Sequence, residues 1–334
     1  MSTTPADRSQ PPIAVVLLNM GGPDSLDAVE PFLFNLLRDR ELVPLPLGIL
    51  WQRLFARMVS RRRAQVVRDY YARIGGKSPL GEITRAQADA LEARLNASRP
   101  GAFRCHVAMR YTPPFSHEVA QALAKDGART IVALSLYPHY TTATTGSSLN
   151  DLRRALAPLS LLEIERWPDE PLYLDALAAQ VRRGLEQFPV ERRGEVEILF
   201  SAHGLPMSFI KKGDPYVDDL KATIAGVMAR IGERPWRLTF QSKVGRQKWL
   251  EPQTDQTLRE LARTGKKEIL AVPISFVSDH IETLYEIDLL FGDEARALGL
   301  DFRRAPSLNV EPTFIEALAA LVERRLGAPH GGAA

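Results

Sequence analysis

The chain has 334 residues, of which 45% are hydrophobic and 25% charged, and its formal net charge is +3. This length and apolar content suffice for two domains with cores of their own, and the single cysteine, Cys105, excludes an internal disulfide and a metal centre of clustered cysteines. Basic residues do not interleave with aromatic ones, apart from the run Arg61 to Arg63, so we expect no nucleic-acid partner.

Strand and helix patterns alternate through the first half of the chain. Residues 13–20 are expected to form a strand, 21–23 (GGP) a turn that could let the backbone approach a ligand closely, and 25–37 a helix. We expect further helices at 48–59, 63–72, 84–96, 117–125 and 149–157, and strands at 103–109 and 129–136. The glycine turn lacks the spacing of a dinucleotide or phosphate fingerprint, which argues against nucleotide binding.

Residues 42–63 combine apolar side chains with a basic cluster. Pro44 and Pro46 forbid a helix where they stand, whereas 48–59 can form one. The composition suits the lip of a pocket that touches acidic lipid headgroups or an acidic substrate, and it equally suits a helix packed on the core with a solvated basic end. Residues 1–12 lack a signal core and no run of 18 apolar residues follows, so we expect a cytoplasmic chain, at most peripheral on the inner face of the membrane.

Hydroxyl groups are concentrated at 141–148 (TTATTGSS), where the chain leads into the helix at 149–157. Such loops cap helices and can bind anions at a helix N-terminus. Capping alone accounts for this composition.

The second half repeats the plan of the first. Strands are expected at 161–164, 196–201, 237–241 and 269–276, and helices at 173–188, 216–231, 254–263 and 312–326. Residues 127–138 resemble 265–276, and residues 18–23 resemble 201–206. We therefore predict an α/β fold of two similar Rossmann-like, doubly wound domains with parallel sheets, at 11–160 and 161–330, facing each other across a cleft.

The segment 269–291 carries the clearest functional signal. A buried strand is followed at once by Ser278, Asp279, His280 and Glu282, and then by helical spacing, with Ser278 or Asp279 expected to cap the helix. Ligands of open α/β sheets bind at the carboxyl ends of strands. Glu282 and Glu286 lie one turn apart, so their repulsion indicates a metal or proton path, although a solvated acidic face has the same pattern.

A histidine, His203, ends a strand of the same half between Ala202 and Gly204. Its imidazole can accept a proton near neutral pH or bind a metal ion of intermediate softness. A lone histidine is more often satisfied by backbone partners. The nearness expected for Asp279, His280 and Glu282 favours a functional role.

Seven segments together resemble the ferrochelatase family. They are 18–23 (LNMGGP), 74–79 (IGGKSP), 137–140 (YPHY), 145–150 (TGSSLN), 200–206 (FSAHGLP), 241–245 (QSKVG) and 278–286 (SDHIETLYE). They follow the family's order, and the match runs from about Ile13 to Arg325. The resemblance implies two Rossmann-like domains around a porphyrin cleft, and an enzyme that inserts Fe²⁺ into protoporphyrin IX in the terminal step of heme biosynthesis.

The resemblance implies that His203 and Glu282 are catalytic, and that His203, Glu282 and Glu286 handle the metal. Two N–H protons must leave the ring as one cation enters, which requires a base and a metal-delivering ligand. We take His203 as the base, while the side from which iron enters stays open. The residues that match the porphyrin pocket are Met20, Tyr71, Ser78, Arg110, Tyr137, Trp249 and Phe276, with Arg62 and Arg63 near the propionates.

Residues 42–59 match the family's mobile lip, which implies peripheral contact with membrane lipid. Many relatives carry a third acid where this chain has Leu290, so the acidic ladder stops at Glu286. With Cys105 alone, the [2Fe–2S] cluster of animal members is not expected. We expect no tightly bound cofactor, and Fe²⁺ and protoporphyrin IX as substrates.

Rival interpretations remain within and beyond the family. The ring could be coproporphyrin III, or the protein could be a cobalt-inserting chelatase for another tetrapyrrole. A non-catalytic tetrapyrrole or metal carrier would use the same pocket without turnover. A nucleotide-dependent enzyme on a Rossmann-like fold is opposed by the missing phosphate fingerprint.

Overall fold

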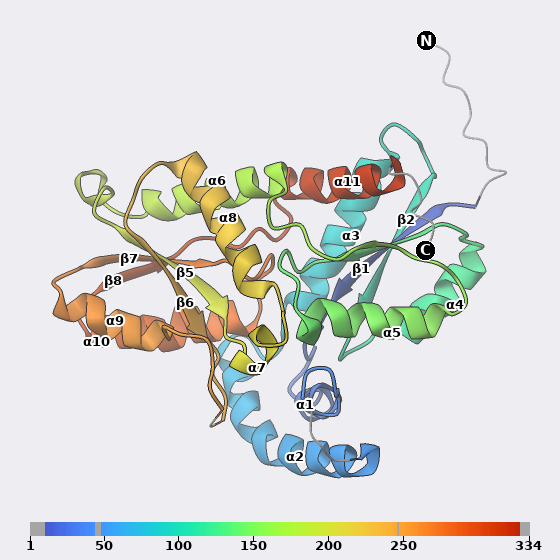
Figure 1. Cartoon of the computed structure of the whole chain (residues 1–334), viewed down its shortest axis with the longest axis horizontal. Helices are drawn as coiled ribbons and strands as arrows, with labels where there is room; N and C mark the ends of the chain where they lie inside the picture. Colours follow the sequence, from blue (N-terminus) through green and yellow to red (C-terminus); the bar gives the residue numbers. More distant parts are fainter. Residues whose placement is uncertain (1–10, 44–47, 246, 328–334) are drawn as a thin grey trace.

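The computed structural model describes residues 11–43, 48–245 and 247–327, and its framework is a pair of parallel four-stranded sheets (Figure 1). The first sheet has the order β2-β1-β3-β4 and is built from β1 (Ile13–Asn19), β2 (Phe103–Met109), β3 (Ile131–Ser135) and β4 (Leu162–Ile164). The second has the order β6-β5-β7-β8 and is built from β5 (Glu197–His203), β6 (Trp236–Gln241), β7 (Glu268–Pro273) and β8 (Asp301–Arg304). The predicted α/β class with two similar Rossmann-like halves is confirmed.

Helices cover both faces of each sheet. The longer ones are α1 (Val29–Leu37), α2 (Ile49–Arg73), α3 (Leu80–Asn96), α4 (Ser116–Asp126), α5 (Ser147–Leu156), α6 (Pro171–Glu186), α8 (Tyr216–Ile231), α9 (Thr254–Arg263) and α11 (Pro312–Gly327). The shorter or wider ones are η1 (Thr142–Gly146), η2 (Val190–Arg192), α7 (Met207–Ile210), η3 (Glu282–Phe291) and α10 (Gly292–Ala297).

Alternation along the strands divides the core. Val15 and Leu17 of β1 face a core shared with α3, α6, α8 and α11, whereas Val16 and Leu18 face α4 and α5. Ile269 of β7 faces a third core under α9, η3 and α10. Because both faces of each central strand are buried, the strands are nearly uninterrupted apolar runs, as parallel sheets require.

The structure corrects several predicted elements. The helices expected at 48–59 and 63–72 form one continuous helix, α2, because nothing in its sequence interrupts the turn at residues 60–62. The strand β8 has the sequence DFRR and was missed because a short, charged edge strand has no apolar run. Pro44 and Pro46 lie outside the described residues.

The strand expected at 161–164 as the start of the second half instead pairs with β3. The first sheet therefore continues beyond residue 160, and α11 packs back onto α3 and α6. The division into domains at 11–160 and 161–330 stays a prediction, and the pairing of β4 argues for a boundary after Ile164.

The helix expected after residue 278 is present, but its winding is different. From Glu282 to Phe291 it is a ten-residue π-helix, η3, whose N-cap position, Ile281, makes no side-chain capping bond. The prediction that Ser278 or Asp279 caps it is wrong: the Ser278 hydroxyl accepts from Gln87, and the Asp279 carboxylate accepts only from side chains. The π-helix is rare, appears mostly as a single-turn bulge, and is frequently found at functional sites.

Helix α2 projects from the layered body at the bottom of Figure 1. Its C-terminal part is fixed to η3, where the Tyr70 and Tyr285 rings stack with centroids 4.3 Å apart and the Arg73 guanidinium lies 5.3 Å from the Tyr285 centroid. Its N-terminal part carries Ile49, Leu50, Trp51 and Leu54, which are 52% to 71% exposed. The two ends of one helix thus have opposite surroundings.

The glycine turn after β1 does allow a close approach, but to protein side chains. Gly21 has φ +82°, and a Cβ on it would lie 2.1 Å from Thr112 Oγ1. A Cβ on Gly22 would lie 2.5 Å from Ser78 Oγ. Both positions require glycine, the first for its backbone conformation as well.

We expect Gly21→Ala to destabilise the fold more than Gly265→Ala. The two glycines have φ +82° and +83°, but nothing lies within 4 Å of a Cβ on Gly265. The left-handed conformation should cost each variant about 1–2 kcal/mol, and the contact with Thr112 should cost Gly21→Ala about 1–3 kcal/mol more. Chemical denaturation measures the free energy of unfolding of both variants. Equal losses of stability would show that the Thr112 side chain moves aside at no cost.

Candidate active site

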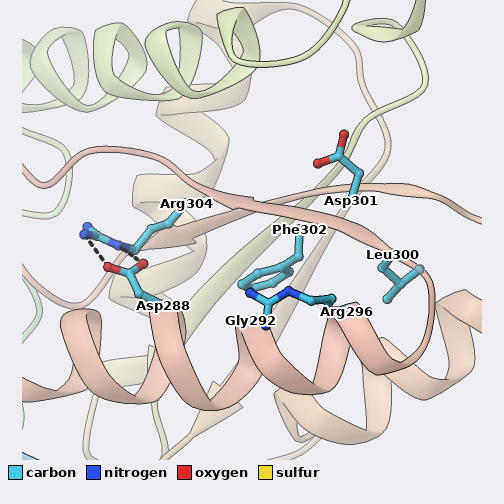
Figure 2. A pocket seen from close by; sticks show the side chains of 7 residues that line it. All are labelled: Asp288, Gly292, Arg296, Leu300, Asp301, Phe302 and Arg304. Carbon is cyan, nitrogen blue, oxygen red and sulfur yellow. Dashed lines mark hydrogen bonds and ion pairs between the residues drawn. The ribbon is translucent and has the colours of Figure 1, made fainter. Parts of the chain in front are cut away.

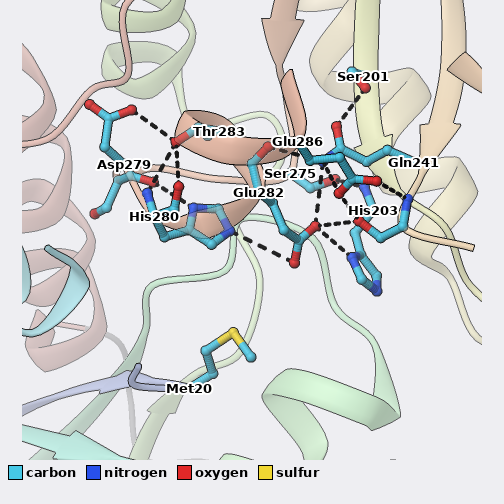
Figure 3. A network of polar contacts seen from close by, with 12 residues as sticks. Met20, Ser201, His203, Gln241, Ser275, Asp279, His280, Glu282, Thr283 and Glu286 are labelled. Atoms are coloured by element: carbon cyan, nitrogen blue, oxygen red, sulfur yellow. Dashed lines mark hydrogen bonds and ion pairs between the residues drawn. The ribbon is translucent and has the colours of Figure 1, made fainter. Parts of the chain in front are cut away.

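The site lies where two neighbouring strands of the second sheet end. His203 is the last residue of β5, and Glu282 is the first residue of η3, which follows β7. The His203 Nδ1 and Glu282 Oε2 atoms are 2.8 Å apart (Figure 3). The predicted nearness of the two residues is therefore present in the structure.

The electrostatics of this pair follow from burial and charge. Burial alone would lower the pKa of the His203 imidazole, but the charge and hydrogen bond of Glu282, with Glu286 behind it, raise that pKa above its ordinary value. Burial would raise the pKa of Glu282, but His203 and His280 hold it well below the usual range. The His203 side chain is 37% exposed, so its free edge is accessible despite the dense protein around it. Glu282 thus stays ionised beside a histidine that binds protons more tightly than usual.

His280 forms the other flank of Glu282, with its Nε2 atom 3.8 Å from Glu282 Oε1. The ring is buried and packs edge-on against Phe276, with centroids 4.3 Å apart. Its Nδ1 atom lies 3.1 Å from the Ser278 carbonyl oxygen, which favours a proton on Nδ1.

Asp279 anchors the loop that carries these residues. Its carboxylate accepts hydrogen bonds from Arg304, Ser307, Asn309 and Thr283 at 2.7–3.1 Å. Burial would raise its pKa, but the Arg304 charge and these donors lower it. Asp279 is therefore an ionised support behind the site and not a free acid within it.

Glu286 lies one turn beyond Glu282. Its Oε1 atom accepts from the Ser242 backbone N–H at 2.7 Å, and its Oε2 atom accepts from Gln241 Nε2 at 3.1 Å. Burial and the nearby charge of Glu282 raise the pKa of Glu286. Of the two stacked acids, Glu286 is thus the one that gains a proton first.

A second layer fixes the backbone of His203. The Tyr216 hydroxyl donates to the His203 carbonyl oxygen at 2.9 Å and lies 2.6 Å from Ser275 Oγ. Behind Tyr216, the ring of His139 is fully enclosed, and burial lowers its pKa to about 3. His139 is therefore a neutral structural residue.

Three of the predicted pocket residues line one cavity opposite His203 and Glu282. Met20, Tyr137 and Phe276 line it, together with Asn19, Leu80, Leu136, Ser275, Val277, Ser278 and His280. In Figure 3 the Met20 side chain, from the end of β1, points toward His280, Glu282 and His203. The cavity thus joins the strand ends of both sheets.

Tyr71, Ser78 and Trp249 are buried around the edges of this region. Tyr71 and Ser78 lie near Gly22, and Trp249 lies against Gly204, immediately after His203. Burial and the Glu282 charge raise the pKa of Tyr71, which places its hydroxyl in the electrostatic range of that carboxylate.

The three arginines predicted for the porphyrin site differ in their surroundings. Arg110 is mostly buried and engaged internally: it pairs with Asp39 at 2.9 Å and donates to Ser147 Oγ at 2.7 Å. Arg62 and Arg63 are exposed on α2. The structure therefore places these two arginines on the projecting helix and not beside His203.

The hydroxyl-rich loop is occupied from within the protein. Asp214, which precedes α8, accepts from the Thr141 hydroxyl at 2.8 Å and from the Thr142 backbone N–H at 2.9 Å. The helix that the loop was expected to cap, α5, has no side-chain capping bond; the Thr141 hydroxyl instead caps the short η1 by accepting from the Ala143 backbone N–H.

A separate hollow lies beside β8, at the outer edge of the second sheet (Figure 2). It is lined by Asp288, Gly292, Arg296, Leu300, Asp301, Phe302 and Arg304. Asp288 and Arg304 pair across it, and none of the predicted site residues lines it.

The sequence model of the ferrochelatase family matches residues 12–326. The chain belongs to the ferrochelatase family. It is 52% identical to the ferrochelatase of Geotalea uraniireducens over 316 residues, which cover 93% of this chain and 97% of that one. It is 41% identical to the ferrochelatase of Aquifex aeolicus, covering 93% and 99%, and 40% identical to the mitochondrial ferrochelatase of Xenopus laevis, covering 95% and 79%. Members of the family are metal chelatases that insert iron into a porphyrin for heme synthesis.

Solved structures resemble the ferrochelatase chain in fold. SirB from Bacillus subtilis with Fe³⁺ has a TM-score of 0.57 at 11% identity, over 94% of this chain and 95% of that one. The sirohydrochlorin chelatase SirB from Bacillus subtilis subspecies spizizenii in complex with cobalt has a TM-score of 0.52 at 10% identity, over 96% and 97%. At this identity the likeness shows the chelatase fold alone.

Sequence reasoning did not assign the residues that support the candidate site. Ser242, Tyr216, Ser275 and Asn309 hold the loops of the site through hydrogen bonds across 13 to 59 positions of sequence, which no local pattern reveals. Ser242 lies in the segment 241–245 that carries the family resemblance, but its role and its left-handed backbone (φ +67°), like that of Asn309 (φ +45°), are visible only in the structure. Within the described ranges, no group of three or more His, Cys, Asp or Glu is arranged to hold a metal ion, so the set His203, Glu282 and Glu286 stays a prediction.

We expect Glu282→Gln to lower the pKa of His203. The variant removes the charge that stabilises the imidazolium while burial, which favours the neutral ring, remains. In the wild type the neutral ring should therefore form only as pH rises past its raised pKa, and in the variant it should form at lower pH. Histidine NMR titration measures this. Asp288→Asn, on the same helix but paired with Arg304, is the control, and an equal shift in that control would contradict the assignment.

Proposed function

We propose that the chain inserts ferrous iron into protoporphyrin IX to form protoheme, and that His203 and Glu282 carry the reaction. The observation behind this is their 2.8 Å contact at adjoining strand ends, opposite a cavity lined by Met20, Tyr137 and Phe276. The assignment of these residues is our proposal, made within the ferrochelatase family to which the chain belongs.

The contact with Glu282 defines what His203 does. With its Nδ1 proton donated to Glu282, a neutral His203 keeps its lone pair on Nε2, the nitrogen on the accessible edge of the ring. That atom accepts the two pyrrole protons in turn as the ion passes into the ring, and it releases the first to solvent at its exposed edge before it takes the second; Glu282 stabilises the imidazolium each time. The raised pKa of His203 makes it a stronger base, although it must first be neutral.

Glu282 and Glu286 act on the metal ion. Carboxylate oxygens replace water around a divalent cation and offset its charge. Glu282 is held ionised, and an approaching cation would stabilise the charge of Glu286, whose pKa is raised by burial and by Glu282. We therefore propose that Glu282 and the His203 Nε2 atom bind Fe²⁺, a substrate, before it enters the ring, with Glu286 as the outer ligand, and that His203 serves as the base only after the ion has left its lone pair.

The ring is bound by the apolar cavity and its surroundings. Met20, Tyr137 and Phe276 present flat or flexible apolar surfaces that suit a π-system, with Tyr71, Ser78 and Trp249 behind them. Arg62 and Arg63 on the projecting helix remain our proposed partners for the propionates, and Arg110 shapes the pocket through Asp39 and Ser147.

We also propose that the chain carries no iron–sulfur cluster and no tightly bound cofactor. Such clusters are held by several thiolates. Cys105 is the only cysteine, it lies within β2, and burial raises the pKa of its thiol.

The function is tested by anaerobic insertion of Fe²⁺ or Zn²⁺ into protoporphyrin IX. We expect His203→Ala to keep the fold and porphyrin binding but to lower insertion by about 10²–10⁴-fold, the usual contribution of a positioned base. Glu282→Gln should be severely impaired and Glu286→Gln less so. His117→Ala, at an exposed position of α4, is the control.

Other outcomes would identify another function. Faster turnover of coproporphyrin III, or a preference for Co²⁺ with a different tetrapyrrole, would show that the reaction is metal insertion but that the substrate is another one. Tight porphyrin binding without wild-type turnover would leave a carrier. An active His203→Ala variant would remove the histidine from the mechanism.

We propose that the N-terminal part of α2 makes peripheral contact with membrane lipid, so that the chain is cytoplasmic and rests on the inner face of the membrane. Ile49, Leu50, Trp51 and Leu54 are exposed beside Arg53 and Arg57, a combination typical of interfacial helices. None of the helices in the described part of the chain has the length and apolar character to cross a bilayer.

Trp51→Glu should weaken binding to vesicles that contain anionic lipid by about tenfold, because a side chain that would enter the interface becomes charged. Wild-type binding should also fall with rising salt. Vesicle co-sedimentation measures both. Val190→Glu, at a position 73% exposed and outside the lip, is the control. Equal binding by all three proteins would contradict the contact.

A further inference from the structure

Ser242 is the residue that follows β6, and its backbone is left-handed, with φ +67°. Apart from Asn309, it is the one residue other than glycine with positive φ in the described ranges. A serine in this conformation is strained by the order of 1–2 kcal/mol, and such strain persists only where the surroundings fix it. The contacts of Ser242 show what this conformation achieves.

Two donors of Ser242 converge on the acidic pair. Its backbone N–H donates to Glu286 Oε1 at 2.7 Å. Its hydroxyl oxygen lies 2.5 Å from Glu286 Oε2 and 2.9 Å from Glu282 Oε2. The two donors thus grip both oxygens of Glu286, and the hydroxyl also lies within hydrogen-bond distance of the carboxylate that contacts His203.

The left-handed turn makes this grip possible. In a continuing strand, successive side chains point to opposite faces, and backbone N–H groups point toward neighbouring strands. At Ser242 the chain turns so that the N–H and the side chain face the same carboxylate. Gln241, the last residue of β6, adds a donor at 3.1 Å from Glu286 Oε2, and its own amide oxygen accepts from the Ser201 hydroxyl at 2.7 Å.

The pair needs such support because like charges one turn apart repel each other. Among the described residues, no positively charged side chain lies within ion-pair distance of Glu286. Its hydrogen-bond partners are the neutral donors of Gln241 and Ser242. Neutral donors hold a carboxylate in place without taking up its charge. That charge remains for a cation.

The geometry points to Ser242 as a positioning residue that holds Glu286 beside Glu282, so that the two carboxylates meet an incoming divalent cation as a preformed pair. This inference rests on the proposed function of Glu282 and Glu286. The side chain and the N–H of Ser242 both contact the carboxylates, so its effect should fall on the metal and not on the ring. Removal of the Ser242 hydroxyl should therefore weaken the binding of the metal ion and leave the binding of the porphyrin unchanged.

Three variants of Ser242 separate the hydroxyl from the backbone. Ser242→Ala loses the hydroxyl and keeps the strain, whereas Ser242→Gly loses the hydroxyl and relieves the strain. Both should raise the KM for Zn²⁺ or Fe²⁺ by about tenfold, which corresponds to the free energy of one hydrogen bond to a charged group. Both should leave the Kd for protoporphyrin unchanged. Ser242→Thr keeps the hydroxyl, and its folded form should have the metal KM of the wild type.

Stability and coupling provide the controls. Ser242→Gly should be as stable as the wild type, so a raised metal KM in that variant cannot come from misfolding. Adding Ser242→Ala to Glu286→Gln should change the metal KM by less than about twofold, because a residue that acts through Glu286 has nothing left to position. Thr264→Ala removes a hydroxyl hydrogen-bonded at the end of α9, away from the site, and should leave the kinetics unchanged.

A direct binding measurement keeps this inference distinct from the proposed function. Co²⁺ reports its ligands by its visible absorption, so we would titrate wild type, Ser242→Ala and Glu286→Gln with Co²⁺ alone. Weaker binding by both variants would support the inference even if the wild type failed to insert metal into any porphyrin, an outcome that would overturn the proposed function. Unchanged metal affinity and KM in both Ala and Gly variants, or a wild type that binds no Co²⁺, would overturn the role of Ser242.

Discussion

The acidic pair on the π-helix, and the repulsion within it, determine most of what surrounds this site. Glu282 lies 2.8 Å from His203, and Glu286 is surrounded by donors from the end of β6. Two carboxylates at this spacing separate or take up protons unless their neighbours prevent it. The wide winding of η3, the left-handed Ser242 and the anchored Asp279 all fix this one arrangement, so the site is prepared for a positive charge before one arrives.

The two sheets contribute unequally to the chemistry. The second supplies His203, Glu282 and Glu286 from its strand ends, whereas the first supplies Met20 and Tyr137, which are apolar or uncharged at neutral pH. Contacts such as Asp214 with Thr141 and Thr142 join the halves directly behind the site. A repeated architecture thus differs between its halves, with charged side chains at the strand ends of one sheet and uncharged ones at those of the other.

Sequence patterns were sufficient for the framework because buried parallel strands are long apolar runs, as in 13–19 and 268–273. They also placed His203 and Glu282 together, since both follow strands of one sheet. They could not predict β8, whose four residues include three charges, or the π winding of η3, whose spacing reads as an ordinary helix. The supports at Ser242, Tyr216 and Asn309 depend on contacts between distant segments, and only the folded chain contains that information.

The continuity of α2 has a mechanical consequence. Its 25 residues form one rod of about 37 Å without a proline or glycine at which it could bend. One end carries the exposed apolar side chains, and the other is clamped to Tyr285, the residue next to Glu286. A tilt of the outer end would have to displace the Gln52 bonds to Leu37 and Val43 as well, and a straight helix would carry that displacement on to Tyr285 and η3.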